Sequence, residues 1–387
     1  MTAAGLRVAL IDPSFFTIPY DARLAGALGA LGHEVVVYGE ARAPAELPTE
    51  FARLRPLFYP ELLRFGSRRW TRSAVRLAKG ALHWRAMRRL VRELRDTAPD
   101  IVHFQWAPLP AVDRLFLGRL RQVAPVVLTA HDSQPLNGTP SPLQTLGAIG
   151  ILREFDGVIV HTEAARERLI AYGVRPGRVV RIAHGPLHEP PQGAAPREPA
   201  AAGKVRFLLF GKLKDYKGAD VLIEAYRRLP RELQALAEVH IVGKPYMDVS
   251  PLQAAAAALG GGVRLDLRFV PDAEMSALLA AADVIVFPYR EIDVSGVLMA
   301  ALGHGRPILA SRIGGFAELL RDGTHGWLVP PGDAGALAAA MARLCREPEA
   351  RRAMGAAVAE LGAALPGWDA IARDTAELYY ALRRWRG

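Results

Sequence analysis

Cysteine is nearly absent from this chain of 387 residues, which contains only Cys345. A single cysteine cannot form an internal disulfide or a cysteine metal site, so the sequence fits a reducing compartment. Long apolar runs are also missing, and none approaches the roughly 18 residues that a membrane-spanning helix needs. The first residues, MTAAGLRVALIDPSFF, read as a strand rather than as a cationic and apolar signal segment. We therefore expect a cytoplasmic protein.

Several motifs that mark common catalytic sites are missing as well. The chain has no D-x-D, no H-E-x-x-H and no cluster of cysteine and histidine, so we expect no metal ion and no tightly bound cofactor. It also lacks the G-x-S-x-G of hydrolases, the G-x-x-x-x-G-K-[ST] of nucleoside triphosphatases and the G-x-G-x-x-G of dinucleotide enzymes. These absences argue against three large enzyme classes.

The chain does contain two similar α/β halves. Short β-branched runs such as LRVALID, DIVHFQW, PVVLTAHD and GVIVHT alternate with helical segments in the first half, and VRFLLFGKL, EVHIVGK, VIVFPY and RPILASR do so in the second. This alternation predicts two Rossmann-like domains with doubly wound parallel sheets. We expect an N-terminal domain over 1–185, a linker rich in Pro, Ala and Gly over 186–203, and a C-terminal domain over 204–366. Ligands should bind in a cleft at the carboxyl ends of the strands.

The net charge of +10 is concentrated in one segment. Between Arg64 and Arg95 there are eleven basic residues and one acid, Glu93, interleaved with apolar residues that include Trp70 and Trp84. A basic helix with tryptophans suits an anionic membrane surface or a nucleic-acid backbone. An ordinary amphipathic helix with an arginine-rich solvated face explains the pattern equally well.

One candidate ligand site is the loop FGKLKDYKGADVLIEAY, which follows a strand and opens a helix. Gly211 and Gly218 allow backbone to approach a ligand closely, and Lys212 and Lys217 supply point charges. These are the components of a phosphate or diphosphate site. Two surface lysines beside a tight turn are the simpler interpretation of the same residues.

A second candidate lies at the end of the strand PVVLTAHD, where His131 and Asp132 should reach the ligand edge of the first sheet. The histidine could donate to a sugar hydroxyl or a phosphate. The alternative is that Asp132 caps the next turn and His131 merely packs.

The second half then resembles a known family. The order FGKLKDYKGADVLIEAYRRL, VHIVGK, VIVFPY and GHGRPILASRIGGFAELLRDGTHGWLVPPGD is similar to that of the family 4 retaining glycosyltransferases of GT-B architecture. ARLAGALGALGHEVVVYG and TAHD of the first half resemble that family's corresponding segments. GWDAIARDTAELYYAL resembles its final helix, so we expect 367–387 to cross back to the N-terminal domain.

The resemblance implies roles for individual residues. Lys212 and Lys217 would hold the donor diphosphate, and His131 would lie near the donor sugar. Phe269 and Val270 would receive the base. The remaining predicted donor-site residues, which lie in or next to the loop REIDVSGV, are Gly211, Glu291, Asp293, Ser295, Gly296 and Val297. In this loop Asp293 could bond donor hydroxyls, while Ser295 and Gly296 begin a helix whose N–H groups could face the diphosphate.

Two departures from the family pattern stand out. Its usual pair of glutamates, with seven residues between them, falls on Ile292 and Ala300 here, and neither is acidic. The glycine-rich loop expected after the first strand is DPSFFTIPYD instead, which suggests Phe16 and Tyr20, with Asp132, as an acceptor wall. A packed loop is an equally good interpretation of these aromatic residues.

The sequence therefore predicts a glycosyltransferase that moves a sugar from a nucleotide-sugar co-substrate to a hydroxyl of a glycan or lipid-linked acceptor. The resemblance implies retention of configuration, and the two lysines suggest catalysis without metal. The Arg64 to Arg95 segment suggests attachment to the inner face of a membrane and a role in cell-surface polysaccharide synthesis. Three alternatives remain: a non-catalytic GT-B subunit, a sugar-nucleotide epimerase, and a nucleic-acid binder, which rests on charge alone.

Overall fold

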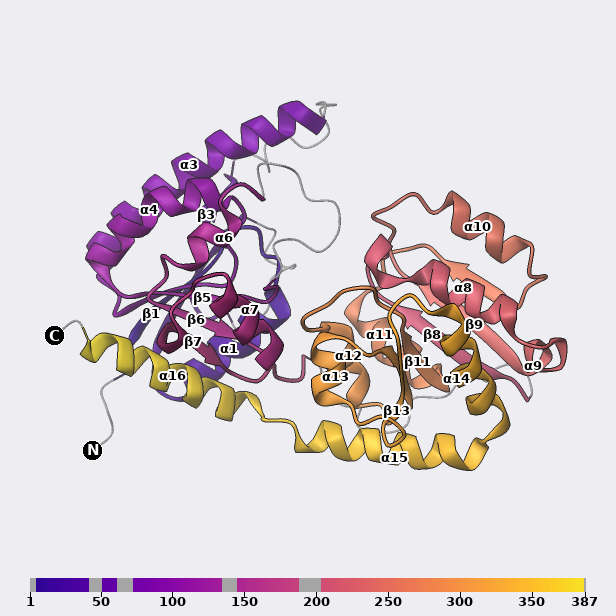
Figure 1. Cartoon of the computed structure of the whole chain (residues 1–387). Helices are drawn as coiled ribbons and strands as arrows, with labels where there is room; N and C mark the ends of the chain where they lie inside the picture. Colours follow the sequence, from indigo (N-terminus) through magenta and orange to yellow (C-terminus); the bar gives the residue numbers. More distant parts are fainter. Residues whose placement is uncertain (1–4, 42–50, 61–71, 134–144, 188–202, 386–387) are drawn as a thin grey trace. The chain divides into compact units, whose positions relative to one another are not determined.

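A computed structural model describes residues 5–41, 51–60, 72–133, 145–187 and 203–385. Contacts divide the chain into two compact units: unit 1 comprises 1–185 and 366–387, and unit 2 comprises 186–365. Each unit is built on one parallel sheet with helices packed on it (Figure 1). The predicted fold class of two Rossmann-like doubly wound domains is confirmed. Most of the predicted linker, residues 188–202, lies outside the described residues.

Unit 1 holds a seven-stranded sheet in the order β3-β2-β1-β4-β5-β6-β7. Every neighbouring pair is parallel. The order reverses between β1 and β4, which places the expected ligand crevice at the carboxyl ends of those two strands. The bounds are β1 Arg7–Asp12, β2 Glu34–Glu40, β3 Leu54–Phe58, β4 Ile101–Phe104, β5 Val126–Thr129, β6 Gly157–Val160 and β7 Val179–Arg181.

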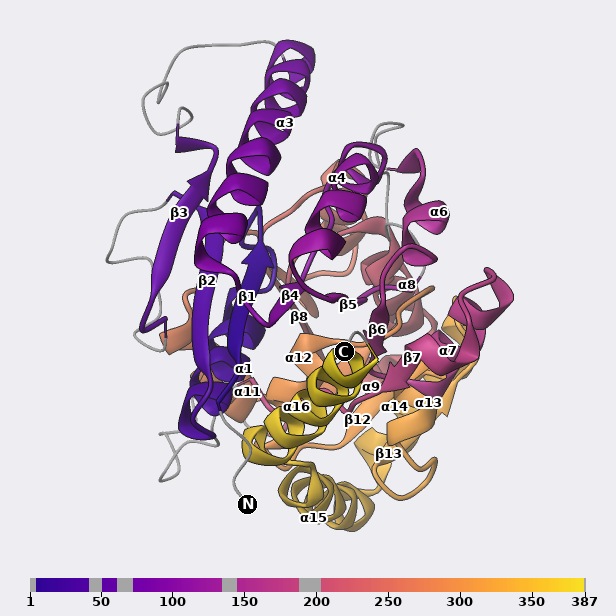
Figure 2. The ribbon, with the colours of Figure 1, turned by 90° about the vertical axis from the view of Figure 1, so that its left-hand side faces the viewer.

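Helices cover both faces of this sheet. Helices α3 and α4 pack together on one face, and α1 packs against α16, the last helix of the chain, on the other (Figures 1 and 2). Leu378 and Leu382 of α16 lie against Gly157, where a Cβ would come within 3.1 Å of Leu382 Cδ1. The last helix thus completes the core of unit 1. The bounds are α1 Ile18–Ala30, α3 Arg72–Thr97, α4 Pro110–Val123, α6 Ala148–Leu152, α7 Glu163–Ala171 and α16 Trp368–Arg384.

Helix α3 carries the described part of the basic segment. Its apolar side chains belong to the core, where Met87, Leu90 and Leu94 are fully buried. Trp84 is 39% exposed and meets Phe116 of α4 edge to face. Among the side chains described in this helix, the exposed arginines are Arg85, Arg88, Arg89, Arg92 and Arg95. The apolar residues of α3 therefore serve packing, and the arginines form a solvent-facing surface, called here the arginine face.

A buried polar chain fixes α3 to its neighbours. His83 of α3 lies 2.6 Å from Asp113 of α4 and 2.8 Å from the hydroxyl of Tyr59, which follows β3. Asp113 also accepts from the backbone N–H of Leu109. The side chains of Tyr59, His83 and Asp113 are all buried, so each needs the others as hydrogen-bond partners.

Unit 2 holds a six-stranded sheet in the order β10-β9-β8-β11-β12-β13, again parallel throughout. Its order reverses between β8 and β11. The strands are β8 Val205–Phe210, β9 Ala237–Val242, β10 Val263–Asp266, β11 Val284–Phe287, β12 Ile308–Ser311 and β13 Gly326–Val329. The helices are α8 Ala219–Arg228, α9 Arg231–Leu236, α10 Ser250–Ala257, α11 Asp272–Ala281, α12 Gly296–Leu302, α13 Gly314–Leu319, α14 Ala334–Arg346 and α15 Pro348–Ala364.

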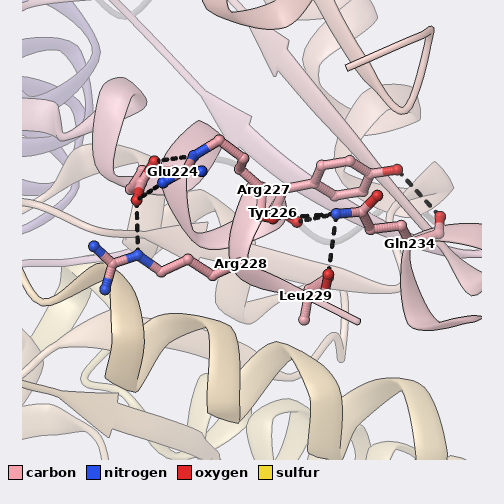
Figure 3. Close-up of polar contacts among 6 residues, drawn as sticks. All are labelled: Glu224, Tyr226, Arg227, Arg228, Leu229 and Gln234. Atoms are coloured by element: carbon pink, nitrogen blue, oxygen red, sulfur yellow. Dashed lines mark hydrogen bonds and ion pairs between the residues drawn. The ribbon is translucent and has the colours of Figure 1, made fainter. Parts of the chain in front are cut away.

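Helix α8, which begins beside the candidate loop, is held at its other end by Gln234 (Figure 3). The Gln234 side-chain amide donates to the carbonyls of Arg227 and Leu229, and the Tyr226 hydroxyl donates to the Gln234 carbonyl. Carbonyls at the end of a helix lack partners within the helix, so these bonds stabilise the end of α8. Glu224 pairs with the guanidinium groups of Arg227 and Arg228 on the exposed side (Figure 3).

Candidate functional site

In unit 2 the predicted loop lies at the ligand edge, between the ends of β8 and β11. Gly211 has φ 124°, and a Cβ there would lie 3.1 Å from Lys217 Nζ and 3.3 Å from Val297 Cγ2. Gly218 has φ 66°, and a Cβ there would lie 2.0 Å from the Pro288 carbonyl oxygen. Both positions therefore require glycine. The structure brings Gly211, Lys217 and Val297 together, as the sequence analysis predicted.

Lys217 is the buried charge of this edge. Its side chain is only 7% exposed, and Nζ donates to the Tyr289 hydroxyl at 2.8 Å while lying 4.6 Å from the centre of the Tyr289 ring. Burial lowers the pKa of Lys217 from 10.5 to about 8. Lys212, the other predicted lysine, is exposed. The pair thus consists of one buried and one solvent-facing cation.

The loop REIDVSGV is fixed from two directions. The Arg290 guanidinium forms two hydrogen bonds with the Asp220 carboxylate, and the Arg290 backbone N–H donates to the Tyr216 carbonyl. On the other side the Asp293 carbonyl accepts from the Gly315 N–H at 2.8 Å. Gly314 has φ 45°, and a Cβ there would lie 2.0 Å from the Ile292 carbonyl oxygen. Gly314 and Gly315 of the IGGF segment therefore hold this loop in place.

Residues of this loop differ in exposure. Asp293 and Ser295 are buried, whereas Glu291 and Gly296 are partly exposed. Ser295 caps α12 by accepting from the Leu298 N–H at 3.3 Å. Helix α12 has only seven residues, so its dipole is small and Lys217 is the stronger anion-binding feature.

The two family glutamate positions are also placed. Ala300 is buried in the apolar core of unit 2, so no polar group replaces a glutamate there. Ile292 is partly exposed and packs against the same core. Phe269 and Val270 lie beyond the end of β10, with the Phe269 ring 68% exposed and Val270 buried. A base-binding role for these two residues stays a prediction.

In unit 1 His131 belongs to a buried hydrogen-bond network. Its Nε2 lies 3.1 Å from Gln105 Oε1, and its Nδ1 lies 3.3 Å from His161 Nε2. His161 Nδ1 donates to the Ile182 carbonyl at 3.0 Å, because a carbonyl only accepts. Gln105 in turn reaches His103, which bonds Thr129 at 2.8 Å.

Burial favours the neutral form of three histidines at this edge. Burial, reinforced by His161 and His184, lowers the pKa of His131 well below its usual value, and burial lowers those of His103 and His184 to about 3. If His161 is neutral and donates to Ile182, its Nε2 accepts from His131 Nδ1. A turn of the Gln105 amide about its last bond, presenting its NH₂ to His131, then satisfies the network without charge. Both ring nitrogens of His131 are therefore engaged within unit 1.

Tyr20 supports this edge from within. Its ring is buried and meets His131, His184 and Trp368 with ring centres 4.7, 5.2 and 5.0 Å away. Burial, reinforced by the charge of Asp21, raises the pKa of its hydroxyl. The structure thus places Tyr20 inside a ring cluster rather than on an exposed acceptor wall. Asp132 is partly exposed, next to His131.

Phe16 does face solvent at this edge. It is 46% exposed, and its ring stacks on Trp106 with centroids 4.7 Å apart and planes 21° apart. Phe16 follows β1 and Trp106 follows β4, the two strands at which the sheet order reverses. The sequence analysis missed Trp106, although the strand-end rule that singled out His131 applies equally to DIVHFQW. It also missed Gln105 and Tyr289 as partners of His131 and Lys217.

Two searches of the described residues found nothing. No described helix combines the length and apolarity needed to cross a bilayer. Within the described ranges, no group of three or more His, Cys, Asp or Glu side chains is arranged to hold a metal ion.

Two parallel α/β units with ligand edges of this kind define a class, the GT-B glycosyltransferases, and comparison with known proteins agrees. Residues 22–185 match the family model "Glycosyltransferase Family 4", and residues 204–347 match "Glycosyl transferases group 1". A solved structure of Anabaena HepE with UDP and glucose aligns with a TM-score of 0.75 at 18% identity, covering 97% of this chain and all of that one. WaaG, a glycosyltransferase of lipopolysaccharide biosynthesis, aligns with a TM-score of 0.66 at 18% identity, over 96% and 99% of the two chains.

Curated relatives narrow the class. The chain is 30% identical over 304 residues to a D-inositol 3-phosphate glycosyltransferase of Geodermatophilus obscurus, covering 73% of this chain and 66% of that one. It is 29% identical to a phosphatidyl-myo-inositol mannosyltransferase of Mycobacterium leprae, over 97% and 96% of the two chains. The chain belongs to the family 4 glycosyltransferases, enzymes that use nucleotide-sugar donors.

Proposed function

We propose that this chain transfers a hexose-type sugar from a nucleotide donor to a hydroxyl of a glycan or lipid-linked acceptor. The observation that carries the proposal is Lys217, a buried ammonium whose hydrogen-bond partner is the neutral hydroxyl of Tyr289. A buried charge without a counter-ion costs stability, and such groups cluster at functional sites. A donor diphosphate would supply the missing negative charge.

The reaction we propose needs no metal ion. Lys217, with the exposed Lys212 nearby in sequence, would stabilise the charge that develops on the departing nucleoside diphosphate. We further propose retention of configuration, with the acceptor attacking from the face that the nucleotide leaves and a donor phosphate oxygen taking the proton. The Phe16 and Trp106 edge of unit 1 would not be required for that chemistry; its stacked rings suit an acceptor sugar or polyol ring.

The acceptor class has support from the relatives. Both curated relatives named above act, by their names, on inositol-containing compounds. The arginine face of α3 is consistent with an acceptor held at an anionic membrane, and a cell-surface glycoconjugate is our proposed product. Each basic residue near such a surface contributes about 1 kcal/mol.

Vesicle flotation tests the membrane part. The variant Arg88→Gln/Arg92→Gln should bind vesicles of anionic phospholipid about thirtyfold more weakly than the unaltered chain. The control, Arg343→Gln/Arg346→Gln, changes two exposed arginines of unit 2 and should leave vesicle binding unchanged. Equal losses in the two variants would show that net charge, not the arginine face, governs binding.

Thermal stabilisation by nucleoside diphosphates and nucleotide sugars tests the donor site. A ligand at a hundred times its dissociation constant adds about 2.7 kcal/mol to stability. We expect a shift with one base, lost in Lys212→Ala/Lys217→Ala and kept in Lys204→Ala, which changes a lysine at the opposite end of β8. No shift with any donor would refute the proposal.

The second candidate is a non-catalytic GT-B subunit. Ala300 and Ile292, at the two positions where the family has glutamates, favour it. The two functions differ in donor hydrolysis and transfer: a binding subunit would be stabilised by a nucleotide sugar but would release no nucleoside diphosphate from it.

A further inference from the structure

The hydrogen-bond partner described for the Lys217 ammonium is a tyrosine hydroxyl rather than a carboxylate. Lysine has three N–H donors, and within the described residues one of them is directed to the Tyr289 hydroxyl. The absence of a side chain at Gly211 leaves the region beside Nζ open, since a Cβ there would lie 3.1 Å from it. Glycine at position 211 thus keeps a side chain away from the Lys217 ammonium.

Tyr289 is itself rigidly packed. Its fully buried ring makes edge-to-face contacts with Tyr216, Phe287 and Phe316, at centroid distances of 6.0, 5.6 and 5.4 Å. Four aromatic rings thus form one cluster in which Tyr289 has no room to change its rotamer. The position of its hydroxyl is fixed by packing before any ligand binds.

The hydroxyl of Tyr289 also connects two segments of the site. Burial raises the pKa of this hydroxyl, and a hydrogen bond with Ser295 opposes the rise. Ser295 in turn accepts from the Leu298 N–H and caps α12. The Tyr289 oxygen can accept from Lys217 and from the Ser295 hydroxyl at the same time, so it joins the loop after β8 to the beginning of α12.

A neutral partner has a chemical consequence. A carboxylate beside Lys217 would pair with the ammonium and compete with a bound anion. A hydroxyl and a ring face orient the ammonium and leave its full charge for the ligand. The chain has Ile292 and Ala300 at the positions of the two family glutamates. Donor binding would therefore depend more on Lys217, and so on the contacts that fix its position.

We propose that Tyr289 is a positioning residue for the donor diphosphate, which it serves by holding Lys217 Nζ with its hydroxyl and its ring face. This inference rests on the proposed function. It predicts that loss of the hydroxyl weakens recognition of the diphosphate and leaves recognition of the nucleoside unchanged.

The test compares Tyr289→Phe with Tyr226→Phe, a matched control. Tyr226 is also a buried tyrosine of unit 2, and its hydroxyl bonds the Gln234 carbonyl away from the site (Figure 3). Calorimetric titrations would use inorganic pyrophosphate, UDP and GDP, with uridine and guanosine as probes of the base site alone. A hydrogen bond to a charged group corresponds to roughly tenfold or more in affinity. We therefore expect Tyr289→Phe to bind pyrophosphate and the diphosphates about tenfold more weakly, with an unchanged nucleoside affinity, and Tyr226→Phe to bind all of them normally.

Outcomes separate the two proposals. If Lys217→Met loses pyrophosphate and diphosphate binding while Tyr289→Phe keeps both, the positioning role is refuted and the donor site stands. If Tyr289→Phe weakens the nucleosides as much as the diphosphates, the effect is a general distortion and the inference also fails. If the unaltered chain binds no pyrophosphate or diphosphate and transfers no sugar, the proposed function fails and the inference with it.

Discussion

The ligand edges of the two units handle buried polar groups in opposite ways. At the edge of unit 1, His103, His131 and His184 are neutral, and the hydrogen bonds of His131 are satisfied by Gln105 and His161. At the edge of unit 2, Lys217 is an ammonium that bonds a neutral hydroxyl. At the first edge the described bonds join neutral groups, and at the second the bond described for the Lys217 ammonium goes to a neutral hydroxyl instead of a carboxylate.

Under the proposed function, this difference suits the two units to different ligands. A neutral, pre-bonded edge is suited to uncharged hydroxyls, for which geometry matters more than charge. An uncompensated buried cation is suited to a diphosphate, whose binding removes the cost of burying the charge. The asymmetry agrees with an acceptor site in unit 1 and a donor site in unit 2. The following substitutions and pH measurements test it.

The largest effect is expected for Lys217→Met. Methionine keeps the buried stem and removes the charge that stabilises the leaving diphosphate, so kcat/KM should fall about a thousandfold. Stability should rise at the same time. The native pKa of about 8 lies below the ordinary lysine value of 10.5, so at neutral pH the buried charge costs on the order of 3 kcal/mol. Donor kinetics and denaturant unfolding at neutral pH measure the two effects.

The pH dependence of stability gives a control on the same variant. Between pH 8 and pH 10.5 the unfolded chain keeps a proton that native Lys217 has released, so the stability of the unaltered chain should rise with pH in that window. Lys217→Met should lack this rise. A variant that is less stable than the unaltered chain, or that retains activity, would contradict the role of Lys217 as an uncompensated charge.

The pH profile of donor kcat/KM comes next. Below pH 8 Lys217 carries its charge, and above it the free enzyme loses that charge, so kcat/KM should fall about tenfold per pH unit above this value. His131 should contribute no change near the ordinary pKa of histidine, because burial lowers its pKa well below that value. An acidic limb near pH 6.5 that disappears in His131→Gln would show a titrating histidine and erase the contrast between the edges.

Much of the difference between the two ligand edges could be predicted from the sequence, and part of it could not. Strand-end position and spacing singled out Gly211, Lys217 and His131, because the carboxyl ends of parallel strands meet at one edge. The partner of Lys217 was not predicted: Tyr289 lies 72 positions away, and only the pairing of β8 with β11 brings the two together. Local patterns do not report such long-range contacts.

Tyr20 is a second residue whose surroundings local sequence patterns did not determine. An aromatic residue in a loop after the first strand is as consistent with an acceptor wall as with a packed core. Its burial depends on Trp368, at the beginning of the last helix, whose ring lies 5.0 Å from it. Trp106, by contrast, was predictable in principle, since it follows a buried strand and its exposed neighbour Phe16 was recognised.

A smaller effect is expected when the aromatic pair of unit 1 is broken. Trp106→Ala removes the ring on which Phe16 stacks and should raise the acceptor KM about fivefold to tenfold, since one aromatic contact contributes roughly 1 kcal/mol. The donor KM should not change. Trp84→Ala, which removes a partly exposed tryptophan of α3, is the control and should affect neither constant. An increase in the donor KM for Trp106→Ala would show that the stacked pair serves the donor rather than the acceptor.

The smallest effect, Asp21→Asn, asks whether a buried polar group at the unit 1 edge is structural. Asp21 is fully buried beside Asp12, and its Oδ2 has no hydrogen-bond partner among the described residues. Burial first, and then the charge of Asp12, raises the pKa of Asp21 well above its usual value. The native state therefore holds a proton that the unfolded chain loses above about pH 4, and this cost grows as pH rises toward the native pKa. Asparagine donates to Asp12 without titrating, so the variant should gain about 1 kcal/mol at neutral pH, the usual contribution of one hydrogen bond.

The decisive comparison is between Asp21→Asn and Lys217→Met, measured by urea unfolding across pH together with donor and acceptor kinetics. Both substitutions relieve a buried ionisable group, so both should stabilise the chain. Only Lys217→Met should lose diphosphate binding, because Lys217 is the cation that a diphosphate would neutralise, whereas Asp21 is fully buried beside Asp12 inside unit 1. If Asp21→Asn impaired transfer as severely as Lys217→Met without loss of stability, the edge of unit 1 would have to supply a charge to the reaction, and its neutrality could no longer separate the acceptor site from the donor site.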